Sequence, residues 1–339
     1  MGRRPLLTRV VAAGLAAAWL ASATAALADY QPGRGLSLLD DRVTLGGYGS
    51  LEASFLDDDG APDQLVVNAL SSFVTLRLTD RWLVFGETEL ENPVHLDRHG
   101  LGTGHDVLSL ERLYTEWQPN DRFRFRVGKM LTPIGIWNPI HADPLVWSTS
   151  RPIATTQFFD TGTTGAEATM FARAGDFDVA WTVFGQATGQ LDDDDDPQNQ
   201  RGAIGSHVDF STVSGLRLGA SFVHFDDHVD RRWETTYGLD ALWATRLVEL
   251  SAEMAANDPD HGKTTWGAYA QVVYHARWEL NPFVRIEYAD LETVDRVPVV
   301  FGVAWKPTGN TVLKLEGLVG GDDTSLGGNG VLSSFSVLF

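Results

Sequence analysis

Residues 122–131, Arg-Phe-Arg-Phe-Arg-Val-Gly-Lys-Met-Leu, decide the fold class because charged and apolar side chains alternate along them. Successive side chains of a β-strand point to opposite faces, so the two Phe residues share one face while Arg124 and Arg126 share the other. The same alternation appears in residues 284–288 and 312–316. A charge is costly at the middle of a bilayer, so such strands predict a membrane barrel with an apolar outer face and a polar lumen.

Sixteen segments of this kind follow one another along the chain. They lie near residues 43–54, 64–76, 82–91, 108–118, 122–130, 165–173, 176–186, 201–210, 215–225, 233–243, 247–256, 264–274, 278–289, 298–306, 311–319 and 330–339. Tilted strands of ~9 to 11 residues cross a bilayer, and single-chain bacterial barrels have an even number of strands. We therefore expect an all-β protein, built as one 16-stranded antiparallel transmembrane β-barrel.

The joins between these segments alternate in length. Short joins such as 119–121 and 174–175 follow even-numbered strands, whereas long joins such as 92–107 and 131–164 follow odd-numbered strands. Outer-membrane barrels have short periplasmic turns and long external loops, whereas a soluble β-sandwich has no reason to keep its two ends so different. The pattern predicts that both ends of the mature chain lie on the periplasmic side.

The N-terminal residues 1–28 have the composition of a secretory signal peptide. Basic residues precede an apolar run, and Ala26-Leu27-Ala28 matches the small-x-small pattern of a cleavage site. We expect a mature barrel domain of residues 29–339, exported through the periplasm into the bacterial outer membrane. The chain has no Cys and a formal net charge of -19, so it has no disulfide or thiolate site, and nucleic acid is not an expected partner.

Two segments resemble known barrel proteins. The C-terminal strand, Val331-Leu-Ser-Ser-Phe-Ser-Val-Leu-Phe339, resembles the assembly signal of outer-membrane β-barrels, whose last residue is aromatic. The segment Gly128-Lys-Met-Leu-Thr-Pro-Ile-Gly-Ile-Trp-Asn-Pro139, with Arg151-Pro152, resembles a strand end and loop of porins in the wider phosphate-selective porin superfamily. This resemblance implies a sixteen-stranded barrel with an inward-folded third external loop, assembled as a homotrimer in outer-membrane lipid. Anion-selective members carry many lumenal Lys residues, and this chain has few, which argues against phosphate selectivity.

The predicted barrel indicates a transport function. Barrels of 16 strands leave an aqueous channel, whereas barrels of 8 strands are filled by side chains. The expected function is a porin for passive diffusion of small polar solutes or ions, without cofactor or metal. Two alternatives remain: a hydrolase whose catalytic residues meet only in space, and a closed barrel that binds a partner at the cell surface. The chain has no H-E-x-x-H, G-x-S-x-G or Walker sequence, so an enzyme is not the expected class.

Loop 131–164 is the longest join and the expected pore constriction. It holds four Pro and two Trp residues, which restrict its backbone and can pack, so we expect it to be ordered. An external lid or a subunit contact is the alternative. The pore-lining charges expected near it are Arg77, Glu87, Glu89, Arg112, Glu116, Arg124, Arg126 and Glu167 on the strands and Asp143 in the loop. Opposed charges across a narrow gap order polar solutes, unless they merely pair between neighbouring strands.

The three arginines of strands four and five set a more specific expectation. Because Arg112, Arg124 and Arg126 would repel one another if unpaired, we expect acidic groups of the facing wall or of the loop, such as Asp143 or Asp160, to lie opposite them. A lumenal charge in water is weakly coupled to stability. Neutralising Arg124 and Arg126 is therefore expected to change selectivity more than folding.

Acidic residues gather in the long loops, as in Asp57-Asp58-Asp59 and in the run from Asp192 to Asp196. One interpretation is a negative vestibule that makes the pore prefer cations at low salt. The others are bridging of divalent cations to lipid headgroups and a solvated loop of mutually repelling charges.

Overall fold

The computed structural model describes residues 28–57, 63–104, 108–140, 142–189, 191, 200–227, 232–291, 295–320 and 329–339. The Asp192 to Asp196 run and, except for Ala28, the predicted signal peptide lie outside these residues. Sixteen long strands of the described residues form the wall: β3 (Val43–Leu56), β4 (Gln64–Thr79), β5 (Trp82–Glu91), β8 (Leu108–Asn120), β9 (Phe123–Leu131), β10 (Gly162–Ala174), β11 (Phe177–Gln186), β12 (Gln200–Thr212), β13 (Leu216–Asp227), β14 (Arg232–Ala244), β15 (Val248–Pro259), β16 (Thr265–Tyr274), β17 (Leu280–Asp290), β19 (Val299–Thr308), β20 (Thr311–Val319) and β21 (Gly330–Leu338). Each overlaps one predicted segment.

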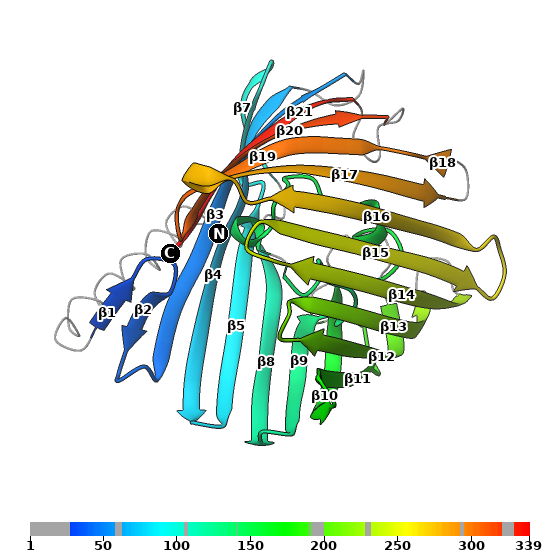
Figure 1. Cartoon of the computed structure of the whole chain (residues 1–339). Coiled ribbons are helices and arrows are strands. Elements are labelled where there is room, and N and C mark those ends of the chain that lie inside the picture. The colour runs from blue at the N-terminus through cyan, green and yellow to red at the C-terminus, as the bar shows by residue number, and fades with distance from the viewer. Residues whose placement is uncertain are drawn as a thin grey trace, which may run out of the picture.

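The strands close into an antiparallel barrel. Each strand of the wall pairs with the next, and β21 returns to β3, with Phe335 opposite Leu51 (Figure 1). The seam continues to the last residue, because Phe339 and Gly47 exchange two backbone hydrogen bonds of 2.8 and 2.9 Å. The prediction of one closed, sixteen-stranded antiparallel barrel is confirmed.

The two faces of each strand differ as the alternation predicted. In β17 the outward Val284 and Ile286 are 41% and 54% exposed, whereas the inward Arg285 and Glu287 are 0% and 3% exposed. The buried interior is therefore largely polar, and the outer surface carries most of the exposed large apolar side chains. No helix within the described ranges is long and apolar enough to cross a membrane.

The joins differ between the two ends of the barrel. Residues 121–122, 175–176 and 309–310 make short turns at one end, and the longer joins lie at the other. The C-terminus lies at the short-turn end, where the Asn310 side-chain amide donates to the Leu338 carbonyl oxygen at 3.0 Å.

Short strands extend the wall where the sequence predicted only loops. At the N-terminus β1 (Ala28–Gln31) and β2 (Gly35–Leu38) form a hairpin, and β2 pairs with β3 beside the C-terminus (Figure 1). At the opposite end β6 (Val94–Asp97) and β7 (Gly100–Thr103) form a hairpin on β4, and β18 (Asp295–Arg296) pairs with β17. The long join at 92–107 thus contains a short hairpin that extends the sheet.

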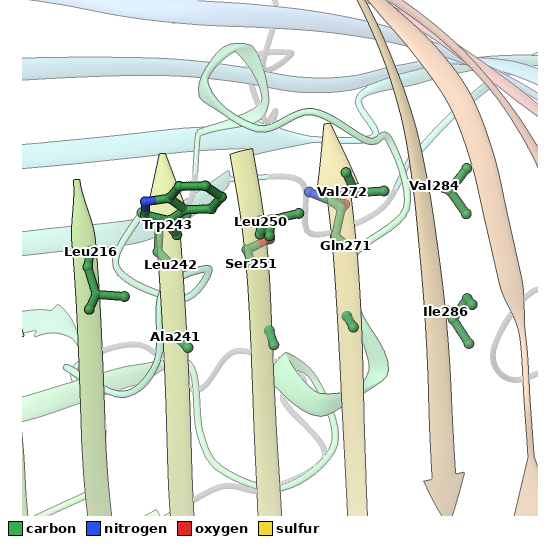
Figure 2. Close-up of a pocket in the computed structure, with 12 residues that line it drawn as sticks. Leu216, Ala241, Leu242, Trp243, Leu250, Ser251, Gln271, Val272, Val284 and Ile286 are labelled. Carbon is green, nitrogen blue, oxygen red and sulfur yellow. The ribbon is translucent and has the colours of Figure 1, made fainter. Parts of the chain in front are cut away.

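The outer surface has an apolar hollow of about 410 Å³ over β13 to β17. Its floor is a row of small side chains in cross-strand register, Ala241, Ala252 and Ala270. Larger side chains of the same strands, including Trp243 and Leu250, surround the row (Figure 2). Because these side chains point out of the barrel, the hollow is separate from the lumen.

Candidate functional site in the barrel lumen

The join between β9 and β10, residues 132–161, folds into the barrel and packs against its inner wall. It holds two single-turn 3-10 helices, η1 (Asp143–Leu145) and η2 (Ile153–Thr155); a third, η3 (Arg277–Glu279), lies in a short turn. A buried apolar cluster joins loop residues to inward residues of β11 to β17; it comprises Ile134, Ile153, Phe158, Phe159, Phe184, Ala203, Val223, Phe225, Ala255 and Ala289. This side of the lumen is thus filled by the loop.

Glu253 on β15 holds the first part of the loop. Its carboxylate accepts the backbone N–H groups of Ile136 at 2.8 Å and Trp137 at 3.1 Å, and the Tyr269 hydroxyl at 2.6 Å. The close approach requires glycine at position 135, where φ is +68° and a Cβ would lie 1.9 Å from a Glu253 oxygen. The buried carboxylate therefore fixes two consecutive N–H groups of the loop backbone, and Tyr269 of the wall holds the carboxylate in place.

Two further glutamates repeat this arrangement. Glu316 on β20 accepts the backbone N–H groups of Thr149 and Ser150, each at 2.8 Å. Glu287 on β17 accepts the Ile153 N–H at 2.7 Å. We call Glu253, Glu287 and Glu316 the glutamate seat. A carboxylate that accepts backbone N–H groups makes strong, charge-assisted hydrogen bonds, so the seat fixes the loop at three points.

Two buried cations hold the middle of the loop. Arg285 is 0% exposed and donates to the Ser148 hydroxyl at 2.5 Å and to the Ser150 carbonyl at 3.0 Å. The Lys314 ammonium donates to the carbonyl oxygens of Asp143 at 2.7 Å and Ser148 at 3.1 Å. Backbone donors and acceptors of the loop are thus both matched by charged side chains of the wall, as buried polar groups require.

The sequence placed Asp143 opposite the arginines of strands four and five, and in the structure Asp143 is bound by two other strands. Its carboxylate accepts hydrogen bonds from the Ser50 hydroxyl at 2.6 Å and the Asn68 amide at 3.0 Å, on β3 and β4. The loop docks on β11 to β17, β20, β21, β3 and β4, and the predicted arginines find their acidic partners on neighbouring strands. Asp160 is buried beside the start of β10, where it accepts the Gly162 N–H at 3.0 Å.

Arg112 on β8 pairs with Glu87 on β5. The shortest distance from its guanidinium to the carboxylate is 2.5 Å, and the Ser71 hydroxyl donates to the other carboxylate oxygen at 2.6 Å. Glu89, two residues further along the same face, accepts the Tyr48 hydroxyl at 2.5 Å. Both glutamates were predicted to face the lumen, and both side chains are buried in the inner wall of the barrel.

The arginines of β9 share two carboxylates. Arg126 donates to Glu116 at 2.7 Å, and its guanidinium lies 3.6 Å from Glu167. Arg124 lies 3.4 Å from the same Glu167 oxygen. Cross-strand pairing, the alternative that the sequence left open, accounts for the contacts of these charges.

These residues form a continuous charged surface on β5, β8, β9 and β10. We call this surface the arginine wall; it comprises Arg112, Arg124, Arg126, Glu87, Glu116 and Glu167. The arginine side chains are 22%, 26% and 24% exposed, whereas Glu87 and Glu167 are 0% and 2% exposed and Glu116 is 17% exposed. The exposed part of this surface therefore belongs mainly to the arginine side chains, and the carboxylates are more deeply buried.

Arg77 does not belong to this surface. It is exposed, and it lies near the turn between β4 and β5. There it lines a polar recess with residues such as Arg34 and Arg42 from the region of the N-terminal hairpin. Its position two residues before the end of β4 places it at the short-turn rim of the barrel.

A second polar cluster was not predicted. His207, Ser221 and Asp240 lie buried on β12, β13 and β14, and both ring nitrogens, the hydroxyl and both carboxylate oxygens have no hydrogen-bond partner among the described residues. The side chains lie over two glycines: a Cβ at Gly219 would be 2.2 Å from an Asp240 oxygen, and one at Gly238 would be 2.5 Å from the Ser221 hydroxyl. Within the described chain no three His, Asp or Glu residues converge as metal ligands.

Comparison with solved structures identifies the architecture. OmpF of Salmonella typhi superposes with a TM-score of 0.63 over 92% of this chain and 99% of its own, at 10% sequence identity. The chain has the fold of a sixteen-stranded porin. An anion-selective porin from Comamonas acidovorans gives a TM-score of 0.60 at 15% identity, over 88% of this chain and 99% of that one.

OmpT of Vibrio cholerae, solved in a trimer form, gives a TM-score of 0.59 at 12% identity and covers 88% of this chain and 99% of that porin. No family model matches the sequence, and no curated protein matches it either. The comparisons thus establish the porin fold, and the resemblance to the phosphate-selective superfamily stays an expectation.

Proposed function

We propose that this protein is a porin of the bacterial outer membrane, through which small polar solutes or ions diffuse passively. The observation that carries the proposal is the arginine wall, whose guanidiniums meet water inside a closed barrel of porin fold. Charged side chains exposed within a lumen mark an aqueous path, because a dry interior would need them fully paired and covered.

The path we propose runs between the arginine wall and the docked loop. The loop covers the inner faces of β14 to β17, so solute would be confined to the side of β5, β8, β9 and β10. The loop then sets the pore size, and the arginines set the charge preference at the narrowest point. The acidic external loops act further away, and their influence decays over ~10 Å at 0.1 M salt.

The same proposal covers the export of the protein, its orientation in the membrane and its assembly. Residues 1–28 would direct export and be removed, leaving a barrel domain of residues 29–339 with its short turns in the periplasm. The apolar outer face supports contact with outer-membrane lipid. The trimer form of the Vibrio porin supports a homotrimer for this chain.

Conductance in planar lipid bilayers tests the proposal. Purified, refolded protein should give discrete current steps, and a salt gradient across the bilayer should give a reversal potential that reports its ion preference. The closed-barrel alternative predicts correctly folded protein, monitored by its heat-dependent mobility on gels, with no current steps. Hydrolysis of ester or peptide probes without current steps would instead support the barrel-embedded enzyme.

A further inference from the structure

Each guanidinium of the arginine wall lies over an aromatic ring. The Cζ atom of Arg112 is 4.8 Å from the ring centroid of Phe85, and that of Arg126 is 5.0 Å from the ring of Tyr114. Arg124 repeats the contact over a third ring at 5.4 Å. Cations within about 6 Å of a ring centroid are attracted by its negative face.

The third ring belongs to Phe171 on β10. All three rings share the inward face of their strands with the charges they support. Phe85 lies two residues before Glu87 on β5, and Tyr114 lies two residues after Arg112 on β8. The rings are partly buried, so they lie in the wall beneath the guanidiniums.

The rings also support one another. Phe85 packs on Tyr114 with ring centroids 5.3 Å apart, and Phe73 of β4 packs on Phe85 at 6.1 Å, both at 27° between planes. A row of stacked rings across three neighbouring strands forms a flat base that does not depend on the charged groups. A base of this kind restricts the motion of the guanidinium groups that lie on it.

Two different groups therefore hold each arginine. A carboxylate of a neighbouring strand binds the edge of the guanidinium, and an aromatic ring supports its face. A long Arg side chain loses up to about 2 kcal/mol of rotamer freedom when it is fixed, and it would leave the edge contact more often without the ring. The planar guanidinium can bind a carboxylate through its edge while its face lies on a ring, and a Lys ammonium lacks this planar geometry.

We infer that Phe85, Tyr114 and Phe171 are positioning residues that fix the guanidiniums of the arginine wall and thereby set its preference for anions over cations. The inference rests on the proposed porin function. The rings do not touch the solute in this scheme. They act through the arginines, by keeping three positive groups extended along the solute path above their buried carboxylates.

Chemical modification tests the positioning without any channel measurement. Detergent-folded protein is treated with phenylglyoxal, which modifies arginine, and the rate at Arg112 is followed by peptide mass spectrometry. Phe85→Leu should raise that rate about two- to fivefold, which corresponds to ~0.5–1 kcal/mol, whereas Phe85→Tyr should keep the wild-type rate. An unchanged rate in Phe85→Leu would overturn the inference even if the protein proves to be a channel.

The reversal potential tests the consequence for selectivity. Measured with 1 M salt on one side, where the vestibule charges are largely screened, Tyr114→Leu should lower the anion-to-cation permeability ratio about two- to fivefold, and Tyr114→Phe should restore it. Phe125→Leu is the matched control, because Phe125 lies on the outer face of β9 and is 37% exposed. Equal effects of Tyr114→Leu and Phe125→Leu on the permeability ratio would mean that the rings only stabilise the barrel and do not position the arginines. Absence of current steps in the wild type would instead refute the proposed function.

Discussion

Glu167 offers the sharpest test of how the lumen is built. Its side chain is 2% exposed and lies 3.4 Å from Arg124 and 3.6 Å from Arg126. The sequence suggested that both arginines could be neutralised with little effect on folding, because lumenal charges stand in water. The arginines do meet water, but the carboxylate they share does not. Arg124→Gln combined with Arg126→Gln would leave that carboxylate buried without a cation.

The geometry sets the size of the effect. At an effective dielectric constant of about 20, each contact at this distance is worth roughly 5 kcal/mol of Coulomb energy before desolvation is subtracted. Removing the partner of a buried charge costs about 3–5 kcal/mol in measured cases, and we expect that loss in unfolding free energy for the double variant. Each single variant keeps one guanidinium beside Glu167, so its loss should be about 1.5–3 kcal/mol, the value of one charged hydrogen bond.

Adding Glu167→Gln to the double variant supplies the decisive control, because it removes the fully buried stranded charge; Glu116, which also loses Arg126, is 17% exposed and can be hydrated. The triple variant should recover most of the lost stability. Urea unfolding in lipid vesicles, followed by Trp fluorescence and by heat-dependent gel mobility, gives the free energies. A loss below about 1 kcal/mol in the double variant, or a triple variant no more stable than the double, would refute the reasoning.

Three further predictions concern the loop and the buried cluster. Gly135→Ala should disturb the docking of the loop, because the new Cβ would overlap a Glu253 oxygen at a residue whose φ is +68°. The current noise of the open channel should rise while the barrel still folds, and a variant whose current traces are as quiet as those of the wild type would contradict this. Deleting residues 138–150 should raise single-channel conductance, because this segment of the loop occupies the lumen. The barrel should still assemble, since the wall charges that the segment binds become hydrated. Unchanged conductance and selectivity would assign the loop another role, such as a subunit contact. A crystal structure should show ordered water hydrogen-bonded to the His207, Ser221 and Asp240 side chains, because none of them has a hydrogen-bond partner among the described residues and the shortest His207–Asp240 distance is 4.0 Å; a dry, unchanged recess would count against it.

The barrel itself could be predicted from the sequence because its signal is local. Alternation within a strand assigns each side chain to one face, and antiparallel neighbours then follow in chain order. Cross-strand pairs such as Glu116 with Arg126 are local in the same sense, and the sequence left them open as an alternative. The arginine wall therefore consists of residues that the sequence had already selected.

The seating of the loop could not be predicted in this way. The three glutamates of the glutamate seat are separated in sequence from the loop residues that they bind by 117, 134 and 167 positions. Local patterning shows that Glu253 or Glu316 points inward, but which inward groups meet the loop depends on the curvature of the closed barrel. Asp143 was accordingly expected opposite the arginines of strands four and five, whereas it contacts Ser50 on β3 and Asn68 on β4.

The glutamate seat has a consequence for the order of events during biogenesis. Part of it lies on β20, and β20 and β21 follow all the other wall strands in chain order. Contacts between residues so distant in the chain form late, because the intervening segment must first be organised. The loop can thus complete its docking only after the barrel has closed at β3 and β21. A newly closed barrel would pass through a wide, leaky stage, and the final narrowing of its interior would be the last step of maturation.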